Sequence, residues 1–267
     1  MTSPAINDPA ALLAPFVSSP ATSMIVVDFD GSLSPIVVDP ATALPTAGAP
    51  ELLEDLALRF GQVMVVSGRP LAFLLERLPH SIDLVGLYGL EGWSNGARWE
   101  HPNGGAWREV MADLALVAST NGPDQMLVEL KDLSLTLHYR GHPELASDVT
   151  AYASSIGNRA GLHVRGARMS VELQPPIATD KGTVIEVVAG EMTAVLFAGD
   201  DVGDLAAFDG LDRLAAAGVH TVRVAVASDE SPPELSERAD LIVASPVELI
   251  SLLGRLRESG PAVPALD

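Results

Sequence analysis

Short apolar runs alternate along the chain with longer segments in which apolar residues recur at helical spacing. The runs at 24–27 and 62–66 are rich in β-branched residues, and each ends at a polar cluster. Continuous apolar runs of this length are typical of parallel strands that are buried on both faces. The leucines of 49–60 predict a helix between these strands, Pro70 can open the next helix, and 82–87 predicts a third strand. Strand and helix therefore alternate up to residue 90, as in a doubly wound parallel sheet.

A different pattern occupies residues 91–176. An Asn-Gly pair at 95–96 lies between short polar and aromatic arms, which predicts a tight antiparallel hairpin. Beyond it, the apolar spacing predicts a helix, two strands, a helix and two more strands, over 105–119, 126–139 with a break near Asp132, 143–156, 162–165 and 169–173. Elements in this order form a small α+β domain, so we predict that 91–176 is an inserted domain.

The alternating pattern resumes at Asp180. Its apolar spacing predicts a helix, a strand, a helix, two strands and a last helix, over 180–188, 194–198, after Asp204, 221–225, 241–243 and from Pro246. The predicted fold class is α/β: a Rossmann-like doubly wound parallel sheet in a core formed by 1–90 and 177–267, interrupted by the α+β domain. The Pro- and Ala-containing segment before residue 24 is assigned no element, and the tail from residue 260 is expected to fray.

Composition limits the class of protein and its partners. The 267 residues are 48% hydrophobic and 19% charged, which is typical of a packed protein rather than a disordered one. With 16 basic and 35 acidic residues, the net charge is −19, which would repel nucleic acid or an anionic membrane surface. The longest apolar runs fall far short of the roughly 18–20 residues of a membrane span. We therefore predict neither nucleic-acid nor membrane partners.

Cysteine content and the first residues bear on chemistry and compartment. The chain has no cysteine, which excludes disulfides, thiolate metal ligands and a cysteine nucleophile. Residues 1–20 lack the basic start and the long apolar run of a signal peptide. We therefore expect a cytoplasmic location.

Three polar clusters follow predicted strands, at 28–32, 67–69 and 199–204. In an open parallel sheet ligands bind outside the carboxyl ends of the strands, so we expect these clusters to share one crevice. A lone aspartate at a strand end is most often a cap or turn residue, but three such clusters together with Lys181 favour a site. Mutual repulsion would raise the pKa values of the aspartates brought together, unless a cation neutralised them: Asp28, Asp30, Asp200, Asp201 and Asp204. Oxygen-only ligands favour Mg²⁺ as that cation.

These groups occur in a fixed order along the chain: Asp28-Phe29-Asp30-Gly31-Ser32-Leu33, Ser67, Lys181 and Gly199-Asp200-Asp201-Val202-Gly203-Asp204. The order resembles the four motifs of the haloacid-dehalogenase-type phosphatases. The resemblance implies that Asp28 is the nucleophile that forms an aspartyl-phosphate, and that Asp30 is the general acid and base. It implies that Ser67 and Lys181 anchor the phosphate, and that Asp28, Asp30 through its backbone carbonyl, and Asp200 bind Mg²⁺. Asp201 and Asp204 would position metal-bound water and Lys181.

A second set of motifs surrounds these clusters: Ser34-Pro35, Ser67-Gly68-Arg69, Glu129 and Lys131 followed by His138-Tyr139-Arg140, Glu172-Leu173-Gln174-Pro175 and Asp180-Lys181-Gly182. The set resembles one family of this group, the trehalose-6-phosphate phosphatases, which release trehalose and phosphate. The resemblance implies that the insertion is a cap that closes over the sugar, with Arg69 at the boundary between core and cap. It implies that four cap residues contact sugar hydroxyls: Glu129, Lys131, Arg140 and Glu172. Charged donors and acceptors suit a disaccharide, whereas the same residues in isolation would be a solvated strand face.

Four positions depart from the usual pattern of that family. Ser32 stands where Thr is usual, and Tyr88 stands where the family has the His of Gly-x-His-Gly. Gly203 and Leu205 replace a Thr and a Glu. Because all three aspartates of 199–204 are kept, we expect the reaction type to hold and a sugar contact to change at Tyr88.

Two alternatives remain open. A related capped phosphatase that acts on another sugar or glycosyl phosphate, such as a sucrose phosphate, would carry the same motifs. The core pattern also fits a receiver-type signalling module, in which an aspartate is phosphorylated and the output is binding. Asp30 and the inserted domain favour an enzyme, because an acid–base group two residues from the phosphoaspartate would shorten its life. No oligomeric state is predicted.

Overall fold

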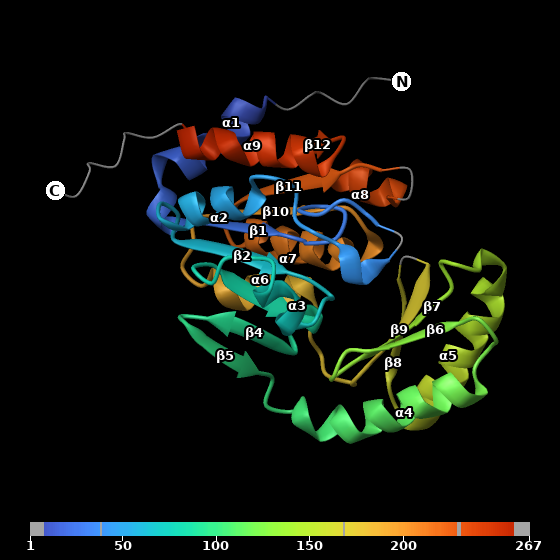
Figure 1. Ribbon diagram of the computed structural model, residues 1–267. Coiled ribbons are helices and arrows are strands. Elements are labelled where there is room, and N and C mark those ends of the chain that lie inside the picture. Colours follow the sequence, from blue (N-terminus) through green and yellow to red (C-terminus); the bar gives the residue numbers. More distant parts are fainter. Residues whose placement is uncertain (1–7, 38, 168, 229–230, 259–267) are drawn as a thin grey trace.

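The computed structural model describes residues 8–37, 39–167, 169–228 and 231–258, which form two β-sheets (Figure 1). The strands of the larger sheet are β1 Ser23–Val27, β2 Gln62–Val66, β3 Asp83–Gly86, β4 Glu91–Ser94, β5 Ala97–Glu100, β10 Ala194–Gly199, β11 His220–Val226 and β12 Leu241–Val243, in the order β12-β11-β10-β1-β2-β3-β4-β5. Those of the smaller sheet are β6 Leu127–Leu130, β7 Leu135–His138, β8 His163–Ala167 and β9 Ser170–Gln174, in the order β6-β7-β9-β8.

The strands from β12 to β3 run parallel, and helices cover both faces of their sheet. On one face lie α1 Pro9–Ser18, α2 Ala49–Ala57, α3 Leu71–Leu75 and α9 Pro246–Glu258, and on the other α6 Lys181–Ala189, α7 Leu205–Ala216 and α8 Pro233–Arg238. Within β1, Ile25 and Val27 pack on the first face, whereas Met24 and Val26 pack on the second. Burial on both faces explains the continuous apolar runs, and the predicted α/β class is confirmed.

Most observed elements lie within a few residues of the predicted ones. The helix predicted over 49–60 ends earlier, at Ala57, and its last turn tightens, since the N–H of Arg59 donates to the carbonyl of Leu56, three residues back rather than four. Short 3₁₀ turns complete the described chain, at Pro20–Thr22, Pro40–Thr42, Leu87–Gly89, Gly105–Trp107, Pro143–Leu145 and Val202–Asp204. The tail from residue 260 lies outside the described residues.

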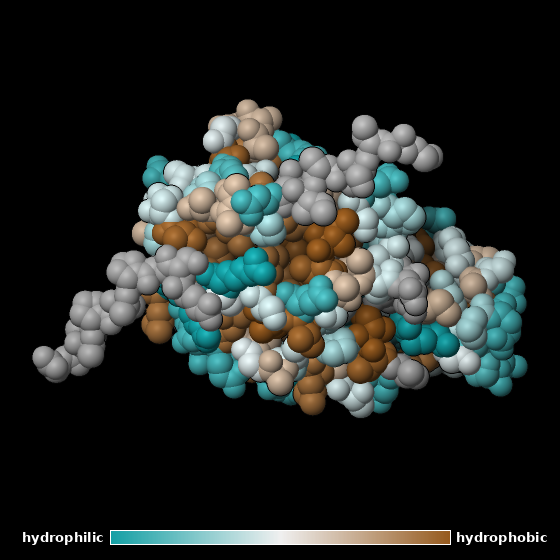
Figure 2. Space-filling view, turned by 90° about the horizontal axis from the view of Figure 1, so that it is seen from above, coloured by the Kyte–Doolittle hydropathy of each residue, from teal (hydrophilic) through white to brown (hydrophobic). Residues whose placement is uncertain are grey.

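The segment before residue 24, which is assigned no element from sequence, contains a helix. The carboxylate of Asp8 caps α1 by accepting a hydrogen bond from the N–H of Ala10 at 3.0 Å, and Leu13 and Phe16 are buried in the core. Pro15 lies inside α1 and obscures its helical pattern. The short helix α8 also escapes prediction. Figure 2 looks onto the face of α1 and α9, where apolar side chains of α1 and Leu256 line a groove.

The hairpin with the Asn95-Gly96 turn is present, but it extends the core sheet. β4 pairs antiparallel with β3, with Trp93 opposite Leu84, and β5 pairs with β4. The sequence predicts this hairpin as part of the insertion, because an Asn-Gly turn identifies a hairpin and not the strand that the hairpin joins. The bounds of the two domains stay a prediction, and the pairing of β4 with β3 favours an insertion that begins after Glu100.

The smaller sheet carries two helices on its outer side, α4 Arg108–Asn121 and α5 Ala146–Ala160 (Figure 1). Leu135, Leu137, Val171 and Leu173 turn one face of the sheet toward these helices. The opposite face is polar and lies across a pocket from the carboxyl ends of the core strands. No helix within the described ranges combines the length and hydropathy that a membrane span requires.

Candidate active site

A pocket between the core strand ends and the polar face of the smaller sheet gathers the residues predicted for one site. The core contributes Asp28, Asp30, Ser67, Arg69, Lys181 and Asp201, and the inserted domain contributes Glu129, Lys131, Arg140 and Glu172. The other two predicted residues, Asp200 and Asp204, are buried next to Asp28. Residues spread over most of the chain therefore meet where the parallel strands end.

Backbone hydrogen bonds tie the loops of this site together. The Asp28 N–H donates to the carbonyl of Ala198 at 2.9 Å, which aligns the loops after β1 and β10. The Ser67 carbonyl accepts from the N–H of Tyr88 at 3.0 Å, which joins the loops after β2 and β3. These bonds continue the sheet beyond its strands and fix the positions of the side chains that follow.

Lys181 is the central cation of the core part of the site. It is the first residue of α6, which Asp180 caps by accepting from the N–H of Thr183 at 2.8 Å. Its Nζ donates to Asp28 Oδ1 at 2.7 Å and to Asp204 Oδ1 at 2.5 Å. Lys181 is only 3% exposed and Asp28 only 4%, so this ion pair lies in a desolvated environment.

Charge and burial shift the pKa values of both partners. Burial raises the pKa of Asp28 well above its ordinary value, the charge of Lys181 counteracts it in part, and the carboxylates of Asp204 and Asp200 raise it further. Burial alone would lower the pKa of Lys181, but the charges of Asp204 and Asp28 outweigh it and raise that pKa well above its ordinary value. Lys181 is therefore held as a cation beside carboxylates that repel one another.

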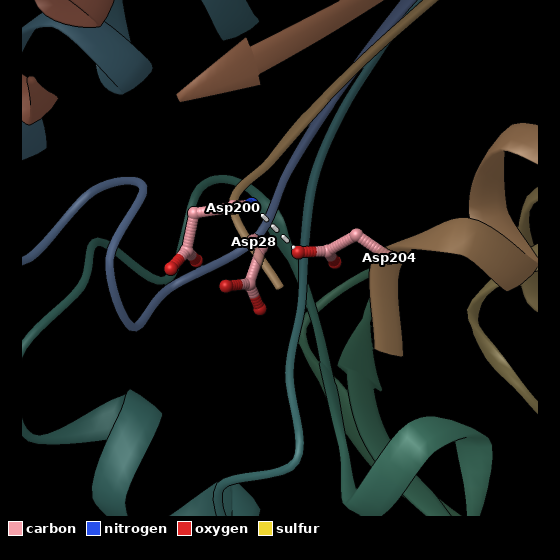
Figure 3. A group of neighbouring side chains, drawn as sticks. All are labelled: Asp28, Asp200 and Asp204. Atoms are coloured by element: carbon pink, nitrogen blue, oxygen red, sulfur yellow. Dashed lines mark hydrogen bonds between the residues drawn. The ribbon is translucent and has the colours of Figure 1, made fainter. Parts of the chain in front are cut away.

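Three buried carboxylates, those of Asp28, Asp200 and Asp204, converge within 4.8 Å of one another (Figure 3). The Asp200 carboxylate fills the space beside Gly31, where a Cβ would lie 2.1 Å from its Oδ2. Gly31 also has a φ of +82°, so this position requires glycine for two separate reasons. Ser32 stands where the family usually has Thr. Its hydroxyl donates to Asp200 Oδ1 at 3.5 Å.

Asp204 organises the loop after β10. Its Oδ2 accepts the N–H groups of Asp200 at 2.8 Å and Asp201 at 3.0 Å, while its Oδ1 accepts from Lys181. Asp201 in turn caps the 3₁₀ turn by accepting from the N–H of Gly203 at 2.7 Å. Because both oxygens of Asp204 accept hydrogen bonds, Asp28 and Asp200 are the better placed donors of oxygen ligands.

Asp30 and Arg69, which both line the pocket, form a two-point ion pair. Arg69 donates from Nε to Asp30 Oδ2 and from Nη2 to Asp30 Oδ1, each at 2.6 Å. Burial alone would lower the pKa of Arg69, but the hydrogen bonds and charge of Asp30 outweigh burial and raise it. Arg69 thus lies at the core side of the pocket, with its guanidinium group committed to Asp30.

The inserted domain presents a row of polar side chains to the pocket. Neighbouring strands place Glu129 opposite Thr136, Thr136 opposite Glu172, and Glu172 opposite Arg165. Glu172 is 1% exposed and accepts a hydrogen bond from the hydroxyl of Ser134 at 3.2 Å. Period-two alternation with the leucines of β7 explains why this face is polar.

Lys131 and His138 hold the two glutamates of this row. The Nζ of Lys131 lies 3.6 Å from Glu172 and 3.9 Å from Glu129, and it donates to the carbonyl of Gly68 in the core at 3.5 Å. The Nε2 of His138 lies 2.8 Å from Glu129 Oε2. Burial alone would raise the pKa of Glu129, but the hydrogen bond of His138 and the charge of Lys131 outweigh burial and lower it.

Tyr88, which stands where the family pattern has His, contacts residues on both sides of the pocket. It has a left-handed φ of +57°, and its hydroxyl packs against Gly68. Its ring lies 5.9 Å from Lys181 Nζ and 5.2 Å from Arg165 Cζ, so it contacts cations of both domains. Gly203 is a neighbour of this ring, since a Cβ there would lie at ordinary contact distance from it, 3.8 Å. Leu205 instead packs against the core.

Several pocket residues are not predicted from sequence as site residues: Thr136, His138, Ser170, Ile36, Val37 and Pro40. The alternation Leu135-Thr136-Leu137-His138 contains a signal for the first two, because residues at even positions share the face of Glu129. The loop residues from Ile36 to Pro40 carry no periodic signal, since they belong to a connection rather than to a strand.

Comparison with known proteins bears on the family. Residues 26–241 match the trehalose-phosphatase family. A trehalose-phosphate phosphatase of Mycobacterium marinum is 32% identical over 253 residues, which cover 87% of this chain and 60% of that protein. The chain therefore spans about 60% of the length of that relative.

Solved structures share the fold. The C-terminal domain of a trehalose-6-phosphate phosphatase from C. albicans has a TM-score of 0.76 at 20% identity, covering 94% of this chain and 97% of that one. A haloacid dehalogenase-like hydrolase from Bacteroides thetaiotaomicron has a TM-score of 0.60 at 16% identity, covering 88% and 99%. The fold is thus that of the haloacid dehalogenase-like proteins, with a second, antiparallel sheet inserted in the core. By the match over residues 26–241, the chain belongs to the trehalose-phosphatase family.

Proposed function

We propose that this chain is a Mg²⁺-dependent phosphatase that hydrolyses trehalose 6-phosphate to trehalose and phosphate through an aspartyl-phosphate on Asp28. One observation carries the proposal: a buried aspartate–lysine pair and a row of sugar-binding residue types face each other across one pocket. The core end of the pocket suits a phosphate group, and the other end suits a molecule that is rich in hydroxyls.

The first step is the transfer of the phosphoryl group to Asp28. Asp28 Oδ1 accepts from Lys181, and Oδ2 makes no hydrogen bond among the described residues, so Oδ2 is the oxygen placed to attack phosphorus. A bond forms between this oxygen and phosphorus while the bond from phosphorus to the sugar oxygen breaks. Asp30 gives its proton to the leaving oxygen, which departs as the sugar hydroxyl.

The second step returns the enzyme to its starting state. Asp30, now ionised, takes a proton from a water molecule whose oxygen attacks the phosphorus of the phosphoaspartate. The bond between phosphorus and Asp28 breaks, and inorganic phosphate leaves. Asp30 lies two residues from Asp28, so one carboxyl group can serve both steps on the same side of the phosphorus.

Lys181 and Ser67 would hold the phosphate oxygens during both steps. Lys181 carries a fixed positive charge beside Asp28, where negative charge spreads over the transferring group. Ser67 is 1% exposed, and its Oγ accepts from the N–H of Arg69 at 3.1 Å, so its hydroxyl proton remains available for a phosphate oxygen.

The residues present fit a hard divalent cation. Three buried carboxylates, those of Asp28, Asp200 and Asp204, lie close together, and Lys181 pairs with only Asp28 and Asp204, which leaves excess negative charge in a desolvated place. Asp28 and Asp200, with the backbone carbonyl of Asp30, would hold Mg²⁺. Bound there, Mg²⁺ would neutralise this charge and polarise the phosphate oxygens.

The decisive experiment is phosphate release from a panel of sugar phosphates, with Mg²⁺ and with EDTA. We expect trehalose 6-phosphate to give the highest kcat/KM, and EDTA to abolish turnover until Mg²⁺ is added back. Independently of activity, Mg²⁺ should raise the Tm of the parent protein and raise that of Asp200→Asn much less. Turnover that is equally fast in EDTA would contradict the metal assignment.

The same panel separates the alternatives. Faster hydrolysis of another sugar phosphate would identify a related phosphatase of different specificity. A long-lived phosphoaspartate without turnover would identify a signalling module instead of an enzyme. The expected cytoplasmic location and the expected lack of nucleic-acid and membrane partners stay predictions.

A further inference from the structure

One buried hydroxyl in the pocket has no hydrogen-bond partner. Thr136 is 3% exposed, and its Oγ1 makes no hydrogen bond with any described residue. Burying a hydroxyl without a partner costs free energy, so such groups are rare in folded proteins and each one calls for an explanation. Thr136 lines the pocket, and because its Oγ1 is itself closed to solvent, a ligand would pair with this atom only after a small movement of the side chain.

Thr136 occupies the centre of the polar row of the inserted domain. It lies opposite Glu129 on β6 and opposite Glu172 on β9. Its neighbours along β7, Leu135 and Leu137, are fully buried on the other face against the helices. The strand therefore fixes the direction of this side chain, and rotation toward the helices is not open to it.

The glutamates beside Thr136 are already engaged by the protein. Glu129 is held by His138 at 2.8 Å, and Glu172 accepts from Ser134 at 3.2 Å and lies 3.6 Å from Lys131. Unlike these glutamates, Thr136 makes no side-chain hydrogen bond with a described residue, so its hydroxyl remains available to a ligand. A hydroxyl group of a threonine can both donate and accept, so it pairs with another hydroxyl in either direction.

Charge decides which part of the substrate reaches Thr136. The two carboxylates that flank it outnumber the one Lys131 ammonium group beside them, so this part of the row disfavours a phosphate relative to a neutral hydroxyl group. The phosphate is drawn instead to Lys181 at the core end of the pocket. The polar row therefore meets the sugar and not the phosphate.

We propose that Thr136 is a specificity-determining residue, which binds a hydroxyl of the sugar part of the substrate through Oγ1. The proposal rests on the proposed function and adds a contact to it. Thr136 is not one of the charged residues that the sequence motifs identify. Threonine and valine are both β-branched, so either would suit a strand equally well at this position. Only the hydroxyl distinguishes threonine from valine here.

The test compares Thr136→Val with Thr136→Ser. Valine keeps the shape and removes the hydroxyl, so kcat/KM for trehalose 6-phosphate should fall about 3- to 10-fold, mainly through KM. Serine keeps the hydroxyl and should restore most of that loss. Turnover of p-nitrophenyl phosphate, which has no sugar, should not change. The matched control is Thr150→Val, whose hydroxyl donates to the carbonyl of Ala146 on the surface of α5, away from the pocket, and should alter neither substrate.

Stability without substrate gives a second readout. Because Oγ1 has no partner in the protein, Thr136→Val should have a Tm equal to or above that of the parent. A lower Tm together with equal losses on both substrates would indicate a structural role and overturn the proposal. Unchanged kcat/KM for trehalose 6-phosphate would overturn it as well.

These outcomes are separable from failure of the proposed function. If the parent hydrolyses trehalose 6-phosphate and Thr136→Val does so equally well, the function stands and the contact is wrong. If the parent prefers another sugar phosphate, the proposed substrate is wrong, and a selective loss in Thr136→Val on the preferred one still supports the contact. If the parent hydrolyses no sugar phosphate, both fail.

Discussion

Arg69 holds both carboxylate oxygens of Asp30, each at 2.6 Å, and so joins the loops after β1 and β2. A protonated carboxyl group accepts hydrogen bonds more weakly than a carboxylate does. In the proposed mechanism the pair with Arg69 is therefore weaker while Asp30 carries the proton for the leaving oxygen. The guanidinium group of Arg69 is thus placed to orient the carboxyl group that we propose as the acid–base residue.

Asp30→Asn should separate acid–base catalysis from binding. Loss of the proton donor should reduce turnover of a sugar phosphate about 10² to 10⁴-fold, because a sugar alkoxide leaves poorly without protonation. The loss should be smaller for p-nitrophenyl phosphate, whose leaving group needs little protonation. Steady-state kinetics on both substrates check this. Equal losses would instead assign a metal-binding or structural role to Asp30.

Arg69→Lys should test the orienting role of the guanidinium group. Lysine keeps the positive charge but cannot reach both oxygens of Asp30 with fixed donors, so kcat should fall about tenfold on trehalose 6-phosphate. The Tm should change little, since a charge of the same sign remains. Parent-like kcat in Arg69→Lys would mean that the charge suffices and that the two-point geometry has no catalytic role.

The fold could be predicted from sequence wherever burial imposes a period. β1 and β2 appear as continuous apolar runs because both of their faces are covered. α1 could not be predicted, because Pro15 interrupts its pattern, and the place of the β4–β5 hairpin could not, because it depends on pairing with β3. The local sequence thus reveals whether a segment is a helix or a strand, but seldom which other strand or helix it packs against.

The site residues that directly follow a buried strand could be predicted from the sequence. Asp28, Ser67 and Asp200 each follow a buried strand, and parallel topology alone brings them together. The pairing of Arg69 with Asp30 and the unpaired hydroxyl of Thr136 depend on side-chain geometry between distant segments, which no spacing in the sequence contains.

Asp28→Asn should abolish turnover and leave the fold intact. The amide is nearly isosteric with the carboxylate but is a poor nucleophile. Without metal, the substitution also removes one of three mutually repelling buried carboxylates, while Asp204 still pairs with Lys181. In EDTA its Tm should therefore equal or exceed that of the parent by up to about 2 to 4 °C. Residual activity, with deamidation excluded by mass spectrometry, would remove Asp28 from the nucleophile role.

The pairing of Glu129 with His138 and Lys131 should make stability depend on pH. The folded protein lowers the pKa of Glu129 below its ordinary value of 4.5, so the ionised form is favoured by folding. This contribution is present above pH 4.5 and is lost as pH falls through the lower, folded-state pKa. Because Glu129 is partly exposed, the contribution is about 0.5 to 1 kcal/mol.

Glu129→Gln checks this expectation through thermal unfolding over a range of pH. The variant should be less stable than the parent at pH 6 to 7, and the two curves should converge as pH falls below about 4. Glu109→Gln is the control, because Glu109 is exposed on α4 in the same domain and lies outside the pocket. A stability difference for Glu129→Gln that persists unchanged into acid would contradict the assignment to an ionised carboxylate.

Substitutions in the inserted domain should separate the substrate from the mechanism. Four variants remove one charged side chain each from the sugar end of the pocket: Glu129→Ala, Lys131→Ala, Arg140→Ala and Glu172→Ala. Each should cut kcat/KM for trehalose 6-phosphate, because it leaves a sugar hydroxyl or a neighbouring polar group unpaired. Such a loss is about 1 to 3 kcal/mol, or about 5- to 100-fold.

Turnover of p-nitrophenyl phosphate should change little in these four variants, since that substrate has no sugar to contact. Lys181→Ala is the control, because a phosphate anchor matters to both substrates and its loss should impair both. If the four variants hydrolyse trehalose 6-phosphate as well as the parent does, these residues form a solvated strand face. The assignment of the sugar would then lose the contacts on which it depends, while the roles of Asp28 and Lys181 would stand.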